Sequence, residues 1–384
     1  MPLKKKTSLL ILLGFVIFLL LFLFKVKGEM VDFEVNYRAG KRLRIGEALY
    51  QTEDGHYMFK YLPCSALLYL PLSFLPLDTA KAIWYFAVVF CSFFLVYISY
   101  KILASEKRKS LYLVILPPLI LAKFLLREIL LGQINTLVAL VLLFMIWFFT
   151  SEKETVLSKR ETYAGILWGM AVALKPHALI FFPYFLVKKK WRAFLSGLGF
   201  LLVVLLAPSF FYGFRGNIDV LKDWISTISR STPVLFTSQD NISIMAFFMK
   251  WTGNQNLSYL LSGLIIVLLA FLVLIVILRG KEIAQAAVLE CSVLLILIPL
   301  VSPLGWDYTL LMSILGVMII IQNFFQYSKF WRGFLVVDFF IISFSLYDIL
   351  GKELYSAFMS WSVITLNFLI LIGYLVYLRF RKIC

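Results

Sequence analysis

The chain has 384 residues, of which 62% are hydrophobic, and its net charge is +16. Water-soluble domains are nearer half apolar, and with only 15% charged residues the chain has no room for a sizeable soluble domain. The basic residues stand in short tracts between long apolar runs, which indicates membrane topology and excludes a nucleic-acid-binding protein.

The apolar runs predict an all-α membrane protein, a single domain over residues 1–384 with about twelve transmembrane helices. A span needs about 20 apolar residues, and fewer where broken helices are enclosed by protein. Spans are expected near residues 8–24, 78–100, 111–126, 134–150, 162–174, 178–190, 193–211, 258–279, 285–301, 308–323, 333–349 and 357–379. The first run is followed by Lys25-Val26-Lys27 and no small-residue cleavage site, which favours a retained span over a signal peptide.

The stretch from 162 to 190 is either one span or two short helices. Pro176 disfavours helix at Lys175 and removes a helical hydrogen bond, so we expect a break at Lys175-Pro176-His177. The distribution of charge also favours two helices, because a single span would move every later basic tract to the other side of the membrane.

Basic tracts alternate with the expected spans and define an inner side of the bundle. These tracts are Lys4–Lys6, 101–109, 152–161, 188–192, 279–282, 329–338 and 379–382. They hold more than half of the Lys and Arg residues but only a small part of the Asp and Glu residues. The positive-inside rule therefore predicts a multi-pass plasma (inner) membrane protein with both termini cytoplasmic and the other turns extracytoplasmic.

Two outer loops are long. In the first, residues 25–77, Val31, Val35, Ala39 and Leu43 recur at four-residue spacing, which predicts an amphipathic helix. Its second apolar piece, 63–77, is interrupted by three prolines and predicts a further interfacial helix. The second large outer loop, residues 212–257, is polar and aromatic.

The polar residues that suit chemistry gather in the outer turns, whereas the inner tracts hold only charges of the anchoring type. Ionisable residues at membrane depth are costly and indicate function. These turns come from several expected helices, and we expect them to converge on one outward cavity. They contain Asp32, Glu34, Lys60, Arg127, Gln133, Asn135, Lys175, His177, Gln239, Asn241, Trp306 and Asp307.

Each candidate has a structural alternative. Asp32 is either a general base, with Glu34 as a candidate ligand of a metal ion, or half of a solvated acidic pair at a helix N-terminus. Lys175 is either a cation for a phosphate or a side chain that extends to the interface. Arg127 pairs with Glu128 or with phosphate, and Asp307 is either functional or only a helix cap beside an interfacial Trp306.

Nothing in the sequence indicates a metal centre or another cofactor, although a divalent metal ion stays possible. The cysteines Cys64, Cys91, Cys291 and Cys384 are scattered through mostly apolar sequence. Without a Cys-x-x-Cys motif or a Cys/His cluster, they indicate neither a zinc site nor a disulfide framework.

Taken together, these residues resemble the family-87 glycosyltransferases, polyprenyl-phosphate-mannose-dependent enzymes of the GT-C superfamily. The resemblance extends over most of residues 30–310 and leaves the three C-terminal spans unmatched. Where the family often has a histidine after its Ser-Pro and Trp motif, this chain has Asp307 and Tyr308. The motifs are Asp32 with Tyr37-Arg38-Ala39, Gly46, Tyr50, Phe59-Lys60-Tyr61-Leu62-Pro63, Pro71-Leu72, Leu75-Pro76, Trp84, Gly132-Gln133-Ile134-Asn135, Leu174-Lys175-Pro176-His177 and Ser302-Pro303-Leu304-Gly305-Trp306.

The resemblance implies a GT-C fold and an inverting transfer of a sugar, most simply mannose, from a polyprenyl-phosphate donor to a glycolipid or glycan acceptor. It implies Asp32 as the general base. For the leaving phosphate we expect Lys175, Arg127, Lys60 and Arg230. For the sugar or acceptor we expect Glu34, Tyr37, Gln133, Asn135, His177, Gln239, Asn241, Trp306 and Asp307.

Two other functions remain open at this stage. A transporter or flippase of lipid-linked sugars would also have broken helices near the membrane centre, although the inner side lacks a matching polar set. A polymerase of the O-antigen type would fit the long outer loops, and the early Asp32 less well.

Overall fold

A computed structural model describes residues 16–103, 110–150, 157–279 and 285–381, and these residues are almost entirely helical. Half of the first predicted span, Cys384 and large parts of the inner basic tracts lie outside the described residues. An antiparallel bridge between Asn241 and Trp306 joins two loops, and no strand is assigned within the described ranges.

Every predicted span within these ranges corresponds to a helix or to a pair of helices. Residues 16–24 are helical as well. The helices are α2 (Val31–Ile45), α3 (Ala66–Tyr69), α4 (Leu77–Leu103), α5 (Tyr112–Ile120), α6 (Ala122–Leu131), α7 (Asn135–Thr150), α8 (Leu157–Leu174), α9 (Phe182–Val187), α10 (Trp191–Leu206), α11 (Ser209–Ser231), α12 (Ile244–Thr252), α13 (Gln255–Leu278), α14 (Ala286–Val301), α15 (Ile314–Gln322), α16 (Lys329–Phe344), α17 (Tyr347–Ser360) and α18 (Val363–Phe380). The longer 3₁₀ helices are η2 (Thr52–Tyr57), η7 (Pro176–Phe181) and η9 (Asp307–Ser313).

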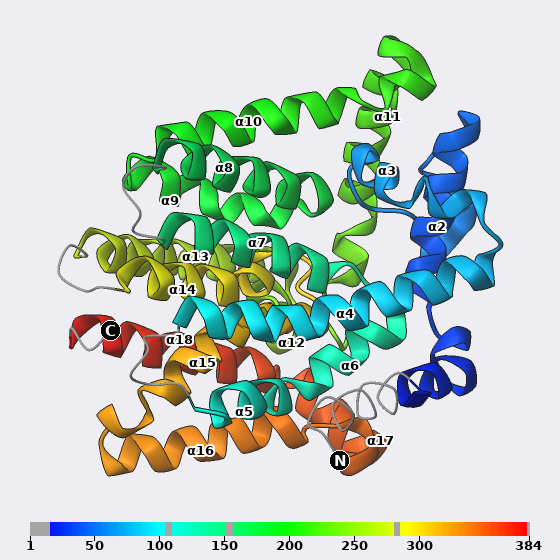
Figure 1. Cartoon of the computed structure of the whole chain (residues 1–384). Coiled ribbons are helices and arrows are strands. Elements are labelled where there is room, and N and C mark those ends of the chain that lie inside the picture. Colours follow the sequence, from blue (N-terminus) through cyan, green and yellow to red (C-terminus); the bar gives the residue numbers. More distant parts are fainter. Residues whose placement is uncertain (1–15, 104–109, 151–156, 280–284, 382–384) are drawn as a thin grey trace, which may run out of the picture.

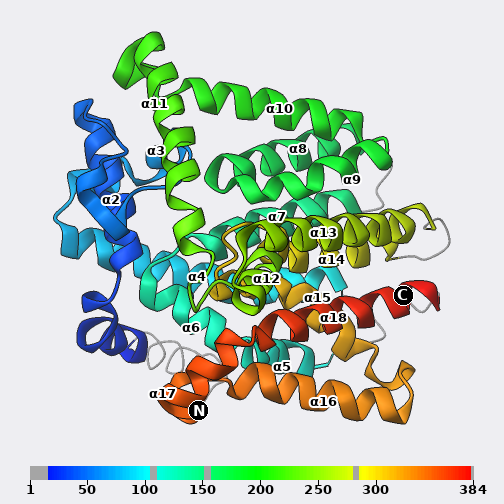
Figure 2. The same ribbon diagram turned by 180° about the vertical axis from the view of Figure 1, so that it is seen from behind.

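Most long helices run side by side and turn back at two opposite ends of the bundle (Figures 1 and 2). At the end that lies on the right in Figure 1, α11 and α17 run across this direction. The bend between α10 and α11 is 98°, and the bend between α16 and α17 is 101°. The predicted span 193–211 therefore ends at Leu206, and 333–349 ends at Phe344, because each chain turns sharply there.

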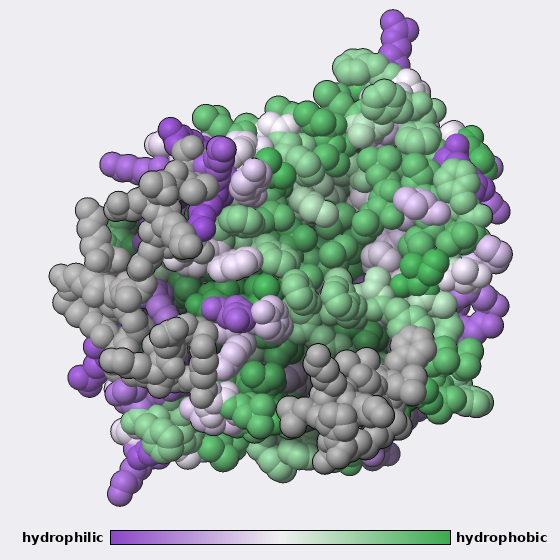
Figure 3. All heavy atoms as spheres, viewed as in Figure 1, coloured by the Kyte–Doolittle hydropathy of each residue, from purple (hydrophilic) through white to green (hydrophobic). Residues whose placement is uncertain are grey.

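Several helices are suited to a bilayer, which supports an integral membrane protein. Among the described residues, three helices are long and apolar enough to cross a membrane: α4, α13 and α18. Counting each bent pair as one span gives five. The surface in Figure 3 is broadly hydrophobic over its middle, with hydrophilic residues toward the edges. The expectation of about twelve spans is met only in part, since other predicted spans are shorter apolar helices such as α7 and α14.

The core of the bundle is formed by α14 and α15. Nearly all residues of both helices are buried, including Ser292 and Gly316. A helix that is apolar on every side belongs inside the protein, so these short helices need not match the thickness of a bilayer by themselves.

The predicted break in 162–190 is confirmed. Helix α8 ends at Leu174, Lys175 is extended with φ −146° and ψ 111°, and the chain reverses through η7 into α9. Helix α10 then packs closely along α8. A Cβ atom at Gly165 would lie 2.0 Å from the carbonyl oxygen of Ala193, so only glycine allows this approach.

Contacts at one end of the bundle involve residues of the predicted inner side. The carboxylate of Glu290 pairs with Lys188 at 2.8 Å and with Arg379 at 3.0 Å. The guanidinium of Arg279 lies 4.7 Å from the ring centroid of Phe380. Three basic tracts that are far apart in the sequence therefore meet at the same end.

The two large outer loops are mostly helical. The first contains the predicted helix as α2, with Val35, Ala39 and Leu43 buried. Its extra positive charge has a structural role, since Arg42 pairs with Asp54 and Arg44 donates to the carbonyl of Ser73. The piece 63–77 forms only short helical turns, including α3. Helices α11 and α12 occupy most of the segment 212–257, the predicted second outer loop.

Candidate active site

A cavity of about 440 Å³ opens where the predicted outer turns meet. The loop that follows α14 lines it, whereas Glu290 is near the start of α14, so the two lie toward opposite ends of this helix. Its walls come from α2, the 56–61 segment, the α6–α7 turn, the start of η7, the 235–240 segment and the loop before η9. The polar and aromatic residues that line it include Asp32, His56, Lys60, Tyr61, Arg127, Gln133, Lys175, His177, Asp240, Trp306 and Tyr308.

Asp32 lies in the first turn of α2 and is held by Gln133. The side-chain amide of Gln133 donates to Oδ2 of Asp32 at 2.7 Å and lies 3.1 Å from the hydroxyl of Tyr308. Burial raises the pKa of Asp32, while the hydrogen bond from Gln133 and the charge of Lys175 act in the opposite direction. The geometry leaves Oδ1 of a half-buried carboxylate without a described hydrogen-bond partner.

Gln133 takes this position because Gly132 ends α6. Gly132 has φ +67°, and a Cβ atom there would lie 2.7 Å from Cβ of Phe33. Any other residue would be strained and would also push α2 away. The indole of Trp84 donates to the Gly132 carbonyl at 2.8 Å and fixes the turn.

Two lysines contribute positive charge to the cavity. Lys60 forms no ion pair with the residues that the structure describes, and burial lowers its pKa against the attraction of Asp32. The ammonium of Lys175 donates to Oδ1 of Asn135 at 2.6 Å and lies 5.1 Å from the ring centroid of Tyr61. Behind it, the carboxylate of Glu128 accepts from Asn135 at 2.8 Å and from the backbone of Thr136 at 2.8 Å.

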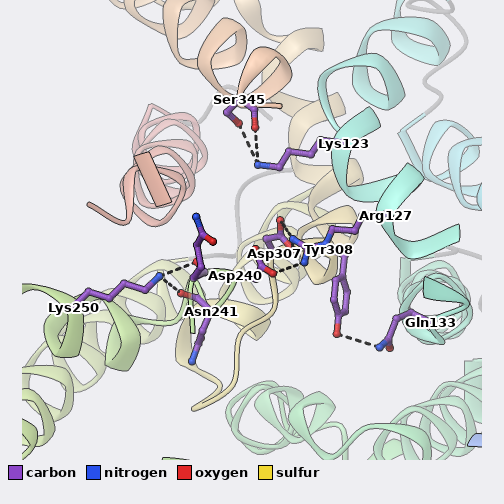
Figure 4. Close-up of polar contacts among 10 residues, drawn as sticks. Lys123, Arg127, Gln133, Asp240, Asn241, Lys250, Asp307, Tyr308 and Ser345 are labelled. Carbon is purple, nitrogen blue, oxygen red and sulfur yellow. Dashed lines mark hydrogen bonds and ion pairs between the residues drawn. The ribbon is translucent and has the colours of Figure 1, made fainter. Parts of the chain in front are cut away.

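Arg127 is bound between two aspartates (Figure 4). One nitrogen donates to both carboxylate oxygens of Asp307 at 2.8 Å, and the other pairs with Asp240. Asp307 is fully buried and does not line the cavity. The positive charge of Arg127 is therefore largely neutralised by the protein itself.

Aromatic rings form another wall of the cavity. The rings of Trp306 and Tyr308 are 16° from parallel, with centroids 6.5 Å apart. His177 is also part of the lining, and its buried Nε2 has no hydrogen-bond partner among the described residues. A buried, unpaired nitrogen in a cavity wall can bind a polar ligand.

The family of the chain follows from its sequence. Residues 59–303 match the family model of glycosyltransferase family 87, well over half of the chain. The chain belongs to glycosyltransferase family 87. It is thus a membrane glycosyltransferase, and its reaction requires a sugar donor and an acceptor. No curated protein and no solved structure matches the chain.

The family match covers most of the cavity of this transferase. Lys60, Gln133, Lys175 and Asp240 all lie within residues 59–303, whereas Asp32 precedes them. Asp32 is therefore part of the cavity through its contact with Gln133 and not through the family match. Among the described residues, no three His, Cys, Asp or Glu side chains form a group suited to a metal ion.

The structure brings only part of the predicted site together. Asp32, Lys60, Arg127, Gln133, Lys175, His177 and Trp306 line the cavity, and Asn135 and Asp307 lie directly behind it.

Other predicted site residues of the transferase lie outside the cavity wall. Since α2 is helical, Glu34 points away from Asp32 and pairs with Lys81 at 2.6 Å. The hydroxyl of Tyr37 donates to the carbonyl of Leu75. Arg230 is exposed, and its Nε donates to the carbonyl of Ser226.

Asn241 and Gln239 are also outside the wall. Asn241 is fully buried, and its side chain binds Pro303 and Gly305, so it joins the loops that carry Asp240 and Trp306. Gln239 is exposed, and its backbone carbonyl accepts a hydrogen bond from the ammonium of Lys250.

Five residues of the site were not among the predicted site residues: His56, Tyr61, Glu128, Asp240 and Tyr308. All but His56 are adjacent in sequence to a predicted residue, and this adjacency was the available signal. The expected Arg127–Glu128 pair does not form, because neighbours on a helix point in different directions.

Proposed function

We propose that this transferase moves a sugar, most simply mannose, from a polyprenyl-phosphate donor to a glycolipid or glycan acceptor on the outer face of the membrane. The observation on which this rests is a half-buried carboxylate, Asp32, in the same cavity as two lysines, Lys60 and Lys175. This transfer requires a carboxylate that accepts a proton and cations that bind an anionic leaving group.

In the proposed reaction Asp32 is the general base. Its free carboxylate oxygen takes the proton of the acceptor hydroxyl, and the hydroxyl oxygen forms a bond to the anomeric carbon. The bond from that carbon to the phosphate oxygen breaks on the opposite side, so the configuration inverts. The polyprenyl phosphate leaves with the bonding electrons.

The leaving phosphate would be bound by Lys60 and Lys175. Lys60 is the better candidate, since no carboxylate pairs with it among the described residues, whereas Lys175 also binds Asn135. Arg127 is less suited than the sequence suggests, because Asp240 and Asp307 already neutralise it. The near-parallel rings of Trp306 and Tyr308 offer a flat wall for the sugar.

The topology is part of the proposal. The basic contacts around Glu290 would face the cytoplasm and the cavity would face the outside, as the positive-inside rule requires. The full multi-pass bundle of the GT-C type would then use short, enclosed helices in addition to the long ones.

A transfer assay tests the function directly. Purified protein is incubated with radiolabelled polyprenyl-phosphate-mannose and membrane lipids, and the products are separated. A new glycosidic bond and released polyprenyl phosphate support the proposal. In sealed vesicles, label that crosses the membrane without forming a new bond would instead favour a flippase.

Lys60 should contribute to donor binding. Replacing it with Ala is expected to raise KM for the donor by about tenfold or more, because a charge-assisted hydrogen bond contributes about 1.5–3 kcal/mol. The matched control is Arg230→Ala, which removes an exposed cation outside the cavity and should leave KM unchanged. Equal effects of the two variants would contradict a specific role for Lys60.

Gln133 should influence the pH dependence of kcat/KM for sugar transfer. Its hydrogen bond lowers the pKa of Asp32, so Gln133→Leu raises that pKa further. A base must be deprotonated, and the acid limb of kcat/KM should therefore move to higher pH, by about one unit. Tyr308→Phe leaves the Asp32–Gln133 bond intact and should not move the limb. An acid limb of kcat/KM at the wild-type pH in Gln133→Leu would contradict this role of Gln133.

A further inference from the structure

A second concave region lies between α16 and α18. It is near the end of α18 that carries Arg379, the partner of Glu290, and so at the end of the bundle opposite the cavity. It has a volume of about 510 Å³. Its lining comprises Tyr327, which precedes α16, with Trp331 and Phe334 of α16 and Ile370, Gly373, Tyr374 and Tyr377 of α18. We call it the α16–α18 groove. It belongs to the C-terminal part of the chain, beyond the region that matches the family.

The groove presents almost only apolar surface, in part because two of its three tyrosines use their hydroxyls in hydrogen bonds within the protein. The hydroxyl of Tyr374 donates to the carbonyl of Trp331 at 2.7 Å, and that of Tyr327 donates to the carbonyl of Tyr374 at 3.4 Å. A Cβ atom at Gly373 would meet nothing within 4 Å, so the groove stays open along α18. Trp331 is 48% exposed at its edge.

Two cations without an ion pair lie close to residues of the groove. The guanidinium of Arg381 lies 5.6 Å from the ring centroid of Tyr377, which lines the groove. Arg332 directly follows the lining residue Trp331, and its guanidinium lies 5.6 Å from the ring centroid of Phe325. Within the described part of the chain, neither forms an ion pair, and the buried Nε of Arg332 has no hydrogen-bond partner. Arg379 differs, since it pairs with Glu290.

We propose that the α16–α18 groove binds an acyl chain of an anionic phospholipid, with the head-group phosphate at Arg332 and Arg381. The apolar groove suits the chain, and the unpaired cations complement the negative charge. The groove lies at the basic end of the bundle, where the leaflet would be cytoplasmic, and anionic lipids in that leaflet attract basic side chains. The polyprenyl donor is a poorer occupant, because its phosphate is needed at Lys60, at the other end.

Photolabelling tests this proposal independently of the transfer reaction. The full chain is placed in phosphatidylcholine nanodiscs with phosphatidylglycerol that has a photoreactive acyl chain, and labelled peptides are mapped. Label is expected on peptides that contain Trp331 and Tyr374. Gly373→Leu fills the groove and should reduce this label about tenfold. The matched control is Gly333→Leu, where the added side chain also meets no atom within 4 Å but lies outside the groove.

The head group is tested by a second pair of measurements. Wild-type protein should be labelled more strongly by the phosphatidylglycerol probe than by a phosphatidylcholine probe, and Arg332→Gln with Arg381→Gln should remove this difference. The site is overturned if Gly373→Leu and Gly333→Leu are labelled alike while both remain folded. Its anionic character is overturned if the two probes label the wild type equally, or if polyprenyl phosphate displaces the label.

Discussion

Asp32→Asn should lower kcat for sugar transfer by about 10²–10⁴ while the protein stays folded. Asparagine keeps the shape of the side chain and can still accept the hydrogen bond from Gln133, but it cannot take a proton from an acceptor hydroxyl. General-base catalysis typically contributes a factor of this size. The measurement is the rate of transfer from polyprenyl-phosphate-mannose at saturating donor, with thermal unfolding as a check of the fold.

The same helix supplies the control. Glu34 is two residues from Asp32, but it pairs with Lys81 outside the cavity, so Glu34→Gln should keep nearly all activity. Both variants remove one negative charge from the first turn of α2, and only one removes a carboxylate from the cavity. If purified, folded Asp32→Asn protein retains a kcat within tenfold of wild type, another group is the base.

Local features of the sequence predicted the scaffold well. Pro176 and the distribution of basic tracts indicated the break at Lys175, because proline acts on its immediate neighbours and the charge rule acts on short loops. The buried face of α2 followed from its four-residue spacing. These features depend on residues close together in the chain.

Directions and partners set by distant contacts were not predictable. Helix α11 lies mostly in the predicted second outer loop. The indole of Trp224 anchors it to the 56–61 segment by donating to the carbonyl of Lys60, and Asn217 anchors it to α10 by donating to the carbonyl of Leu205. An apolar run shows that a helix is present, but it shows neither the residue where the helix ends nor the direction in which the chain then turns.

The different positions of Asp32 and Glu34 show a related limit of prediction from the sequence. Two acids two residues apart share a face only in an extended segment, whereas the four-residue spacing from Val31 predicts a helix, in which Asp32 and Glu34 point in different directions. In the helix, one carboxylate enters the cavity and the other reaches α4. The site therefore depends on secondary structure at a position where the hydrophobic pattern is only beginning.

Arg127→Met should destabilise the protein by about 3–5 kcal/mol, since it leaves the fully buried Asp307 without its cation and facing Asp240. The measurement is the free energy of unfolding in detergent, compared with Lys222→Met. Lys222 pairs with Asp219 on the surface, where an exposed ion pair contributes less than about 1 kcal/mol. Similar small losses in both variants would show that the Arg127 cluster does not stabilise the fold.

A double variant separates the structural role of Arg127 from donor binding. In Arg127→Met with Asp307→Asn the buried charge is gone, so part of the lost stability should return. If Arg127 acts through the fold, transfer activity should return together with the stability, because the loop that carries Trp306 and Tyr308 regains its position. If Arg127 instead binds the donor phosphate, stability returns while KM for the donor stays high. Since Asp240 and Asp307 already neutralise the guanidinium, we expect the first outcome.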